Sequence, residues 1–158
     1  MVIKIGINGF GRIGRLVMRA AAENPDVCIV QINDPAGDPA TLAHLLQFDS
    51  VHGRSAHEAT AENDRIQFAN FNALVTQNKN IAESDWSACD VVIEASGKMK
   101  TKAMLQAYLD QGVKRVVVTA PVKEEGVLNV VMGVNHQAYD KSIHRIVTAA
   151  SCTTNCLA

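Results

Sequence analysis

The sequence lacks several features that would assign it to common classes of protein. It has no apolar run of about 18 residues, so nothing in it predicts a membrane span. Its net charge of −1 gives no reason to expect nucleic acid or a membrane surface as a partner. Repeats, linkers and low-complexity segments are also missing. With 47% hydrophobic residues, residues 1–158 are sufficient for the core of one α/β domain.

Cysteine and histidine are sparse and dispersed. The four cysteines show no paired spacing, which argues against a disulfide framework and favours a reducing cytoplasm. The N-terminus has no signal-peptide pattern. The five histidines are scattered along the chain, so no metal site is predicted.

Near the N-terminus, a glycine motif lies between a strand and a helix. Residues 2–8 alternate as a strand, Gly9–Gly14 spell G-x-G-x-x-G, and residues 15–22 favour a helix. A second strand over residues 28–32 follows, and Asp34 lies 20 residues beyond the last glycine of the motif. In dinucleotide-binding βαβ units such glycines allow a tight turn and close approach of the pyrophosphate, while the acid binds a ribose diol. The pattern therefore predicts a dinucleotide site.

Asp34 also bears on the choice of cofactor. A carboxylate there would accept from a free 2′-hydroxyl and repel a 2′-phosphate, which favours NAD over NADP. Alternatively, Asp34 only caps the turn of residues 34–37. Arg12 is likewise open to two interpretations, a counter-charge beside the phosphates or a solvated side chain.

A second motif lies at the other end of the chain. Residues 145–150 form a β-branched run that predicts a strand, and Ser151 is a suitable N-cap for a helix that follows. Cys152 would then lie at the start of that helix, where the free N–H groups favour a thiolate nucleophile. Cys28, Cys89 and Cys156 fit better as small buried hydrophobic residues.

The segments between these motifs predict a doubly wound, Rossmann-type parallel sheet with a small antiparallel insertion. Ligands of such sheets lie beyond the carboxyl ends of the strands. We therefore expect Asn8 to Gly14, Asp34, Ser96-Gly97, Thr119-Ala120 and Cys152 to converge on one crevice. The expected intermediate elements are a helix over 39–48, a polar loop over 49–53, an antiparallel insertion over 57–77, a strand over 91–95, a helix over 101–110 and a strand over 115–119.

Together these motifs resemble the N-terminal, cofactor-binding part of the phosphorylating glyceraldehyde-3-phosphate dehydrogenases. The resemblance covers the whole chain, and Ala150-Ser151-Cys152-Thr153-Thr154-Asn155-Cys156 is its most specific motif. The other matching segments are residues 7–15, 32–35, 48–53 and 132–136.

The resemblance implies roles for particular residues. Cys152 would attack the aldehyde to give a thiohemiacetal, hydride transfer to NAD would leave a thioester, and inorganic phosphate would release an acyl phosphate. Ser151 and Thr153 would help to bind the attacking phosphate. The implied cofactor-binding residues are Asn8, Gly9, Phe10, Gly11, Arg12, Ile13, Gly14, Asn33, Asp34, Pro35, Lys79, Ser96, Gly97 and Thr119.

The sequence also departs from the family pattern. Lys79 stands where an arginine is usual near the adenine, and lysine lacks the planar group that stacks on a base. Residues 34–37, 97–101 and 122–128 resemble a branch associated with arsenate resistance, in which arsenate replaces phosphate. The histidine base, the substrate-phosphate residues and most contacts of the expected homotetramer would lie beyond Ala158. We therefore expect this chain to bind NAD without turnover.

Other functions remain open from the sequence. The chain would otherwise be a stand-alone NAD-binding or redox-sensing module that uses Cys152. A third interpretation is a relative that acts on erythrose 4-phosphate, because it would share the same nucleotide and cysteine motifs.

Overall fold

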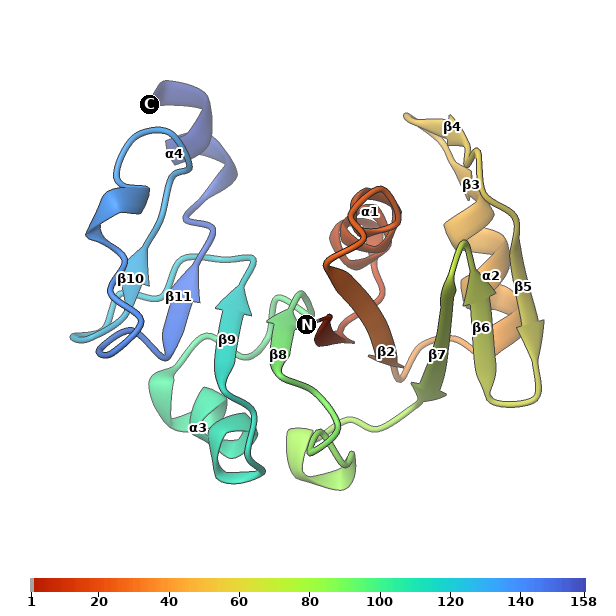
Figure 1. The fold of residues 1–158 in the computed structure, drawn as a ribbon, viewed down its shortest axis with the longest axis horizontal. Helices are drawn as coiled ribbons and strands as arrows, with labels where there is room; N and C mark the ends of the chain where they lie inside the picture. Colours follow the sequence, from red (N-terminus) through yellow and green to blue (C-terminus); the bar gives the residue numbers. More distant parts are fainter. Residues whose placement is uncertain (1) are drawn as a thin grey trace.

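One large mixed sheet organises the structure, a computed structural model that describes residues 2–158. Within that range nine strands join in the order β10-β11-β9-β8-β1-β2-β7-β6-β5 (Figure 1). Neighbours from β10 through β7 pair in parallel, whereas β7, β6 and β5 pair antiparallel. The strands are β1 (Ile3–Asn8), β2 (Val27–Asn33), β5 (Ala59–Glu62), β6 (Arg65–Phe68), β7 (Phe71–Thr76), β8 (Val91–Glu94), β9 (Arg115–Val118), β10 (Leu128–Asn129) and β11 (Ile146–Thr148).

Helices and a small hairpin connect these strands. Residues Phe48–Asp49 (β3) and Gly53–Arg54 (β4) pair as a separate antiparallel hairpin. None of the helices in residues 2–158 has the length and apolar character that crossing a membrane requires. The helical segments are α1 (Arg12–Ala21), α2 (Pro39–Gln47), α3 (Lys102–Asp110), α4 (Cys152–Leu157) and the short 3₁₀ turns η1 (Ile81–Glu83) and η2 (His136–Ala138).

Local sequence explains where the helices begin. Asp38 caps α2 by accepting a hydrogen bond from the backbone N–H of Thr41 at 2.7 Å, and Pro39 takes the first helical position. Thr101 caps α3 in the same way, accepting from the N–H of Met104. Gly112, at φ +95°, follows the end of α3, where a left-handed residue ends a helix without strain.

Two hydrophobic cores lie on opposite faces of the sheet. The first joins α1 and α2 to β1, β2 and the β5–β7 strands, and the second joins α3 and η1 to β8, β9 and β11. Each large apolar side chain buried in these cores stabilises the fold by about 1.5–3 kcal/mol. The largest fully buried side chains include Trp86, Tyr108, Phe10, Phe68, Phe71, Ile7 and Met18.

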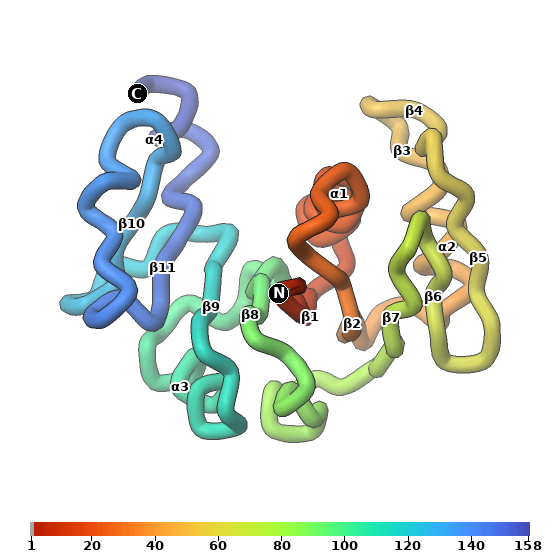
Figure 2. The backbone as a smooth tube through the Cα atoms, viewed as in Figure 1, coloured from red at the N-terminus to blue at the C-terminus, as the bar shows by residue number. Residues whose placement is uncertain are grey.

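The sheet is strongly twisted. In Figure 1, β8, β9 and β11 point upward whereas β2 and β7 point downward, although all of them belong to the parallel part of one sheet. This rotation is the accumulated right-handed twist of successive strands. The tube in Figure 2 shows that the chain starts beside the central strands and ends at α4, next to β10 and β11.

The predicted doubly wound α/β fold is confirmed, with differences in detail. The antiparallel segment is continuous with the main sheet, because β7 pairs in parallel with β2. Within the insertion over 57–77 the sequence predicts strands at 65–68 and 73–76, and β5 is an additional one. The first helix begins at Arg12 rather than at residue 15, because it starts within the glycine motif. The expected polar loop over 49–53 contains the turn of the β3–β4 hairpin.

Candidate functional site

The glycine loop after β1 combines two closely packed glycines with an open one. Gly9 has φ +91°, and a Cβ there would lie well inside 3.0 Å of the backbone N of Ser96. A Cβ on Gly14 would collide with the carbonyl oxygen of Gly9. A Cβ on Gly11 would meet nothing within 4 Å. Packing therefore explains the first and third glycines, and the space over the second is free for a ligand to approach the backbone.

The start of α1 suits an anionic group. The N-cap residue is Gly11, which has no side chain to cap the helix. The first turn also carries no acidic residue. The N–H groups of this turn are therefore available, and the dipole of the ten-residue helix adds a positive potential there. The side chain of Ile13, in the same turn, is half exposed.

Asp34 is tied to this loop. One carboxylate oxygen accepts from the N–H of Phe10 at 2.7 Å, and the other accepts from the N–H of Ala36 at 2.9 Å. The second bond is the turn cap that the alternative interpretation expected. The first shows that the carboxylate also reaches the glycine loop. Pro35 follows and is exposed.

Arg12 is exposed, as the solvated interpretation expects, and it also contacts the β3–β4 hairpin. Its guanidinium donates to the Ser50 hydroxyl at 2.9 Å and lies 3.7 Å from the Asp49 carboxylate. Backbone N–H groups of His52 and Val51, helped by Arg12, lower the pKa of Asp49. The charge of Arg12 is thus directed toward the β3–β4 hairpin.

The other predicted cofactor residues follow neighbouring strands. Asn33 ends β2, and its carbonyl accepts from the N–H of Gly9 at 2.8 Å. Ser96 and Gly97 follow β8, with Gly97 at φ +71°. Thr119 follows β9 and donates from its N–H to the carbonyl of Glu94 at 3.0 Å. Lys79 is exposed beyond β7.

Cys152 lies in a sharp elbow between β11 and α4. Ala150, at φ +55°, turns the chain, which is an uncommon conformation for a residue with a side chain. Ser151 caps α4 by accepting from the N–H of Thr153 at 3.2 Å, as predicted. The Asn155 amide donates to the carbonyls of Ala149 and Ser151, both at 2.9 Å, and so closes the elbow.

The prediction that Cys156 is buried is wrong. Both Cys152 and Cys156 are exposed, because α4 has no buried residue. Cys89 is buried as predicted, and Cys28 is partly buried. Burial, with the negative charges of Asp90 and Asp85, raises the pKa of the Cys89 thiol to about 11.

The expected convergence is met in part. Direct contacts join the glycine loop to Asn33, Asp34 and Ser96, whereas Thr119 contacts the backbone of Glu94 beneath them. Cys152 follows β11, three strands from β1, which corresponds to about 14 Å across a sheet. Among residues 2–158, no hydrogen bond links Cys152 to the glycine loop.

One residue of this region, Glu94, was not predicted from the sequence. It ends β8 and is 1% exposed, and its carboxylate lies directly under the loops described above. An acid at an inward position of an otherwise apolar strand was the signal that could have revealed it.

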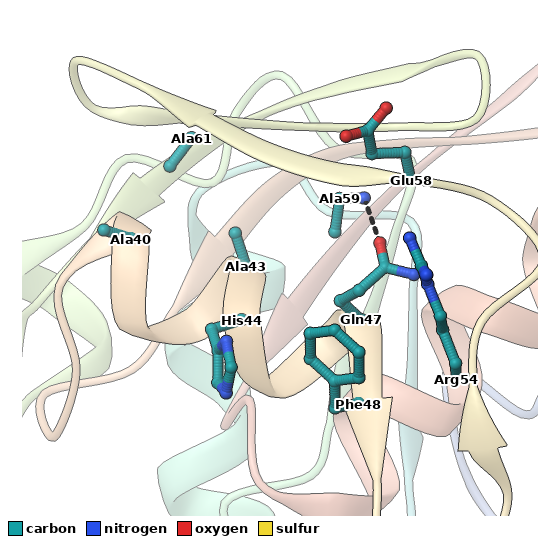
Figure 3. A pocket seen from close by; sticks show the side chains of 9 residues that line it. All are labelled: Ala40, Ala43, His44, Gln47, Phe48, Arg54, Glu58, Ala59 and Ala61. Atoms are coloured by element: carbon teal, nitrogen blue, oxygen red, sulfur yellow. Dashed lines mark hydrogen bonds between the residues drawn. The ribbon is translucent and has the colours of Figure 1, made fainter.

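A hollow of about 360 Å³ lies elsewhere, between α2 and β5 (Figure 3). The side chains drawn there include His44 and Phe48 on one side and Arg54 and Glu58 on the other. None of the residues predicted for the nucleotide site lines it. Across residues 2–158, no cluster of histidine, cysteine or acidic side chains is arranged to hold a metal ion.

The geometry can now be compared with known proteins. A family model described as glyceraldehyde 3-phosphate dehydrogenase, NAD binding domain, matches residues 3–102. The chain belongs to this family. The glycine loop, the start of α1 and Asp34 all lie inside the matched range, and NAD is the cofactor of this domain.

Relatives cover the rest of the chain as well. Glyceraldehyde-3-phosphate dehydrogenase 3 of a Nostoc species is 47% identical over 100% of this chain and 47% of its own length. The enzymes of Geobacillus stearothermophilus and Bacillus subtilis (dehydrogenase 1) are each 42% identical with the same coverage. The chain thus spans about half the length of the curated relatives that it matches. These findings do not favour a stand-alone NAD-binding or redox-sensing module.

Proposed function

We propose that this chain is the nucleotide-binding part of an NAD-dependent phosphorylating glyceraldehyde-3-phosphate dehydrogenase, with residues 1–158 as its NAD-binding domain. The observation that carries the proposal is that one sheet has an open glycine loop and an exposed cysteine elbow beyond the carboxyl ends of its parallel strands. The substrates would be glyceraldehyde 3-phosphate and inorganic phosphate, or arsenate in the related branch.

The residues present fit the cofactor. The free N–H groups around Gly11 would bind the pyrophosphate, and the Asp34 carboxylate would accept from the adenosine ribose. NAD, when bound, supplies the acceptor for the hydride that leaves the substrate. Further contacts are proposed for Asn8, Gly9, Phe10, Arg12, Ile13, Gly14, Asn33, Pro35, Lys79, Ser96, Gly97 and Thr119.

Cys152 is the proposed nucleophile. Its thiolate sulfur forms a bond to the aldehyde carbon, and the carbonyl electron pair moves to oxygen to give a thiohemiacetal. The backbone N–H of Cys152 would stabilise that oxyanion. Loss of the hydride leaves a thioester. An oxygen of phosphate, held by Ser151 and Thr153, then bonds to the acyl carbon as the carbon–sulfur bond breaks, which releases an acyl phosphate and restores the thiolate.

We also infer that this chain alone binds NAD without turnover. No histidine hydrogen-bonds to Cys152 in residues 2–158, so the base that would activate the thiol is not supplied there. In the whole protein we propose a homotetramer working in glycolysis. Free cysteines throughout residues 2–158 agree with a reducing cytoplasm.

A calorimetric titration of the chain with NAD and, separately, NADP tests the cofactor part. We expect NAD to bind more tightly, and Asp34→Ala to weaken NAD binding by about 10- to 100-fold, the cost of one or two strong polar contacts. Asp38→Ala is the matched control, because the Asp38 carboxylate also accepts from a nearby backbone N–H but does so at the start of α2. Equal NAD and NADP affinities would contradict the role of Asp34.

The dehydrogenase part is tested by NADH formation from glyceraldehyde 3-phosphate and phosphate. The chain alone should give none, and adding the remaining half of a relative in trans should give activity that Cys152→Ser abolishes. Activity that survived Cys152→Ser would overturn the assignment of the nucleophile.

A further inference from the structure

Glu94 is an exception among the acidic residues. By the exposure of the whole residue, it is the only buried aspartate or glutamate within residues 2–158, although the side chain of Asp49 is also only 4% exposed. A carboxylate removed from water is costly unless hydrogen bonds replace its hydration. Its position at the end of β8, beneath the glycine loop, therefore requires partners.

Four hydrogen bonds reach the two oxygens of this carboxylate. The Asn8 amide donates to Oε2 at 2.7 Å, and the Tyr108 hydroxyl donates to the same oxygen at 2.6 Å. The backbone N–H of Ser96 donates to Oε1 at 2.8 Å, and the Ser96 hydroxyl donates to it as well. Burial and the Glu94 charge raise the pKa of Tyr108 far above its ordinary value, so its hydroxyl remains a donor.

The hydrogen bonds continue from Asn8 to the end of β2. Asn8 Oδ1 accepts from the Asn33 amide at 2.8 Å. Asn33 is fixed in turn by the backbone of Asn78, which accepts from its Nδ2 and donates to its Oδ1, both at 2.9 Å. The Asn78 backbone fixes which way the Asn33 amide is turned. The Glu94 carboxylate, which can only accept, fixes the Asn8 amide, and the Asn33–Asn8 hydrogen bond is compatible with both orientations.

The network joins two loops that are already in contact. Gly9 packs so closely on Ser96 that a Cβ on Gly9 would collide with the Ser96 backbone. One oxygen of Glu94 binds the residue before Gly9, and the other binds Ser96 itself. The same carboxylate thus sets the spacing of the glycine loop and the loop after β8.

We propose that Glu94 is a positioning residue for the NAD site, whose carboxylate holds the glycine loop and the Ser96 loop in the geometry that receives the nucleotide. The inference rests on the cofactor site proposed above. Glu94 itself does not touch the nucleotide in this proposal. It acts by lowering the conformational cost of binding, because the loops are ordered before the ligand arrives.

Two variants separate positioning from stability. Glu94→Gln keeps the shape but places an NH₂ group against the donors of Asn8 and Tyr108, or of Ser96 if the amide is reversed. Tyr108→Phe removes one donor to the same carboxylate from α3, away from both loops. We expect urea unfolding to show both variants as less stable. Calorimetry at the same temperature should show NAD binding about 10- to 100-fold weaker in Glu94→Gln and changed less than about threefold in Tyr108→Phe.

Three outcomes would decide the matter. Wild-type chain that binds no NAD would overturn the cofactor site itself. Wild-type binding with equal NAD affinity in Glu94→Gln would overturn only the role of Glu94, as would equal losses of affinity in both variants. If Glu94→Gln does not fold, hydrogen exchange of the nucleotide-free wild type tests whether the Ser96 loop is ordered before NAD binds. Slow exchange of the Ser96 amide supports the proposal, and fast exchange refutes it.

Discussion

The two halves of the sheet differ in how one face is covered. Over β1, β2 and β7 this face packs against α1 and α2 in a continuous core. Over β9, β10 and β11 the same face is open, with a hollow of about 530 Å³ whose lining includes Val117, Val130 and Val147. The face is continuous, because Val117 pairs with Ile93, which still packs against the core.

The difference explains how the two candidate sites are held. Under the glycine loop, hydrogen bonds are buried between packed layers, where a low local dielectric strengthens them. At the elbow, Cys152 is exposed and the turn is held by its neighbours, mainly Asn155, Ser151 and Thr148. Changes in the covered half should therefore affect the whole fold, whereas changes at the elbow should remain local.

The largest effect is expected from Gly9→Ala in the covered half. The new Cβ would collide with the Ser96 backbone at a left-handed φ, so we expect a loss of about 3 kcal/mol of unfolding free energy and of NAD binding. Gly11→Ala is the control, since its Cβ meets nothing. It should change stability by less than about 1 kcal/mol yet weaken NAD binding at least about tenfold. Urea unfolding and calorimetry measure both, and equal stability losses would contradict the packing argument.

Thiol reactivity compares the exposed elbow with the core around Cys89, on the opposite face of the sheet from α1 and α2. At about pH 8 we expect iodoacetamide to modify exposed Cys152 and Cys156 at least about 100-fold faster than buried Cys89, whose pKa is raised to about 11. Mass spectrometry of digested protein gives the rate for each cysteine. Urea should abolish the protection of Cys89. Rapid native labelling of Cys89 would show that the core formed by α3, η1, β8 and β9 opens readily.

A smaller, opposite effect is expected at the elbow. Ala150→Gly removes a side chain from a residue at φ +55°, so relief of strain and the greater freedom of the unfolded chain should nearly cancel, with a net gain of at most about 1 kcal/mol. NAD affinity should not change. A measured loss above about 1 kcal/mol in urea unfolding would mean that packing of the buried Ala150 methyl group outweighs its strain.

The smallest effect is expected at the amino end of the strands. Lys114 donates to Asp90 at 2.6 Å and the N–H of Lys4 donates at 2.9 Å, and both bonds lower the pKa of Asp90. Because this pKa is depressed in the folded state, its contribution to stability is present above the unfolded value of about 4 and is lost as pH falls through the folded value. Asp90→Asn should remove this part of the pH dependence. The change in unfolding free energy should be less than about 1 kcal/mol, because the ion pair is exposed. Unfolding curves between about pH 3 and 6 measure it, and an unchanged profile would contradict it.

Much of the fold was predictable from local patterns. The alternation of residues 2–8, the glycine spacing and the position of Asp34 predicted the first βαβ unit, and Ser151 predicted the start of α4. These predictions succeed because strand alternation, turn glycines and helix caps depend on residues close in the chain. The missed strand β5 is a short, mostly exposed segment whose pairing with β6 supplies its order.

The sequence by itself determined the βαβ unit, the glycine loop and the cysteine elbow, because each is specified within a few residues. The tertiary structure alone decided that Arg12 turns toward Ser50, that Cys156 is exposed and that Glu94 is the acceptor beneath the loops. Asn8 and Glu94 are 86 positions apart, and only the pairing of β1 with β8 brings them together. Such contacts depend on which distant segments pack side by side, a property that no local pattern of residues contains.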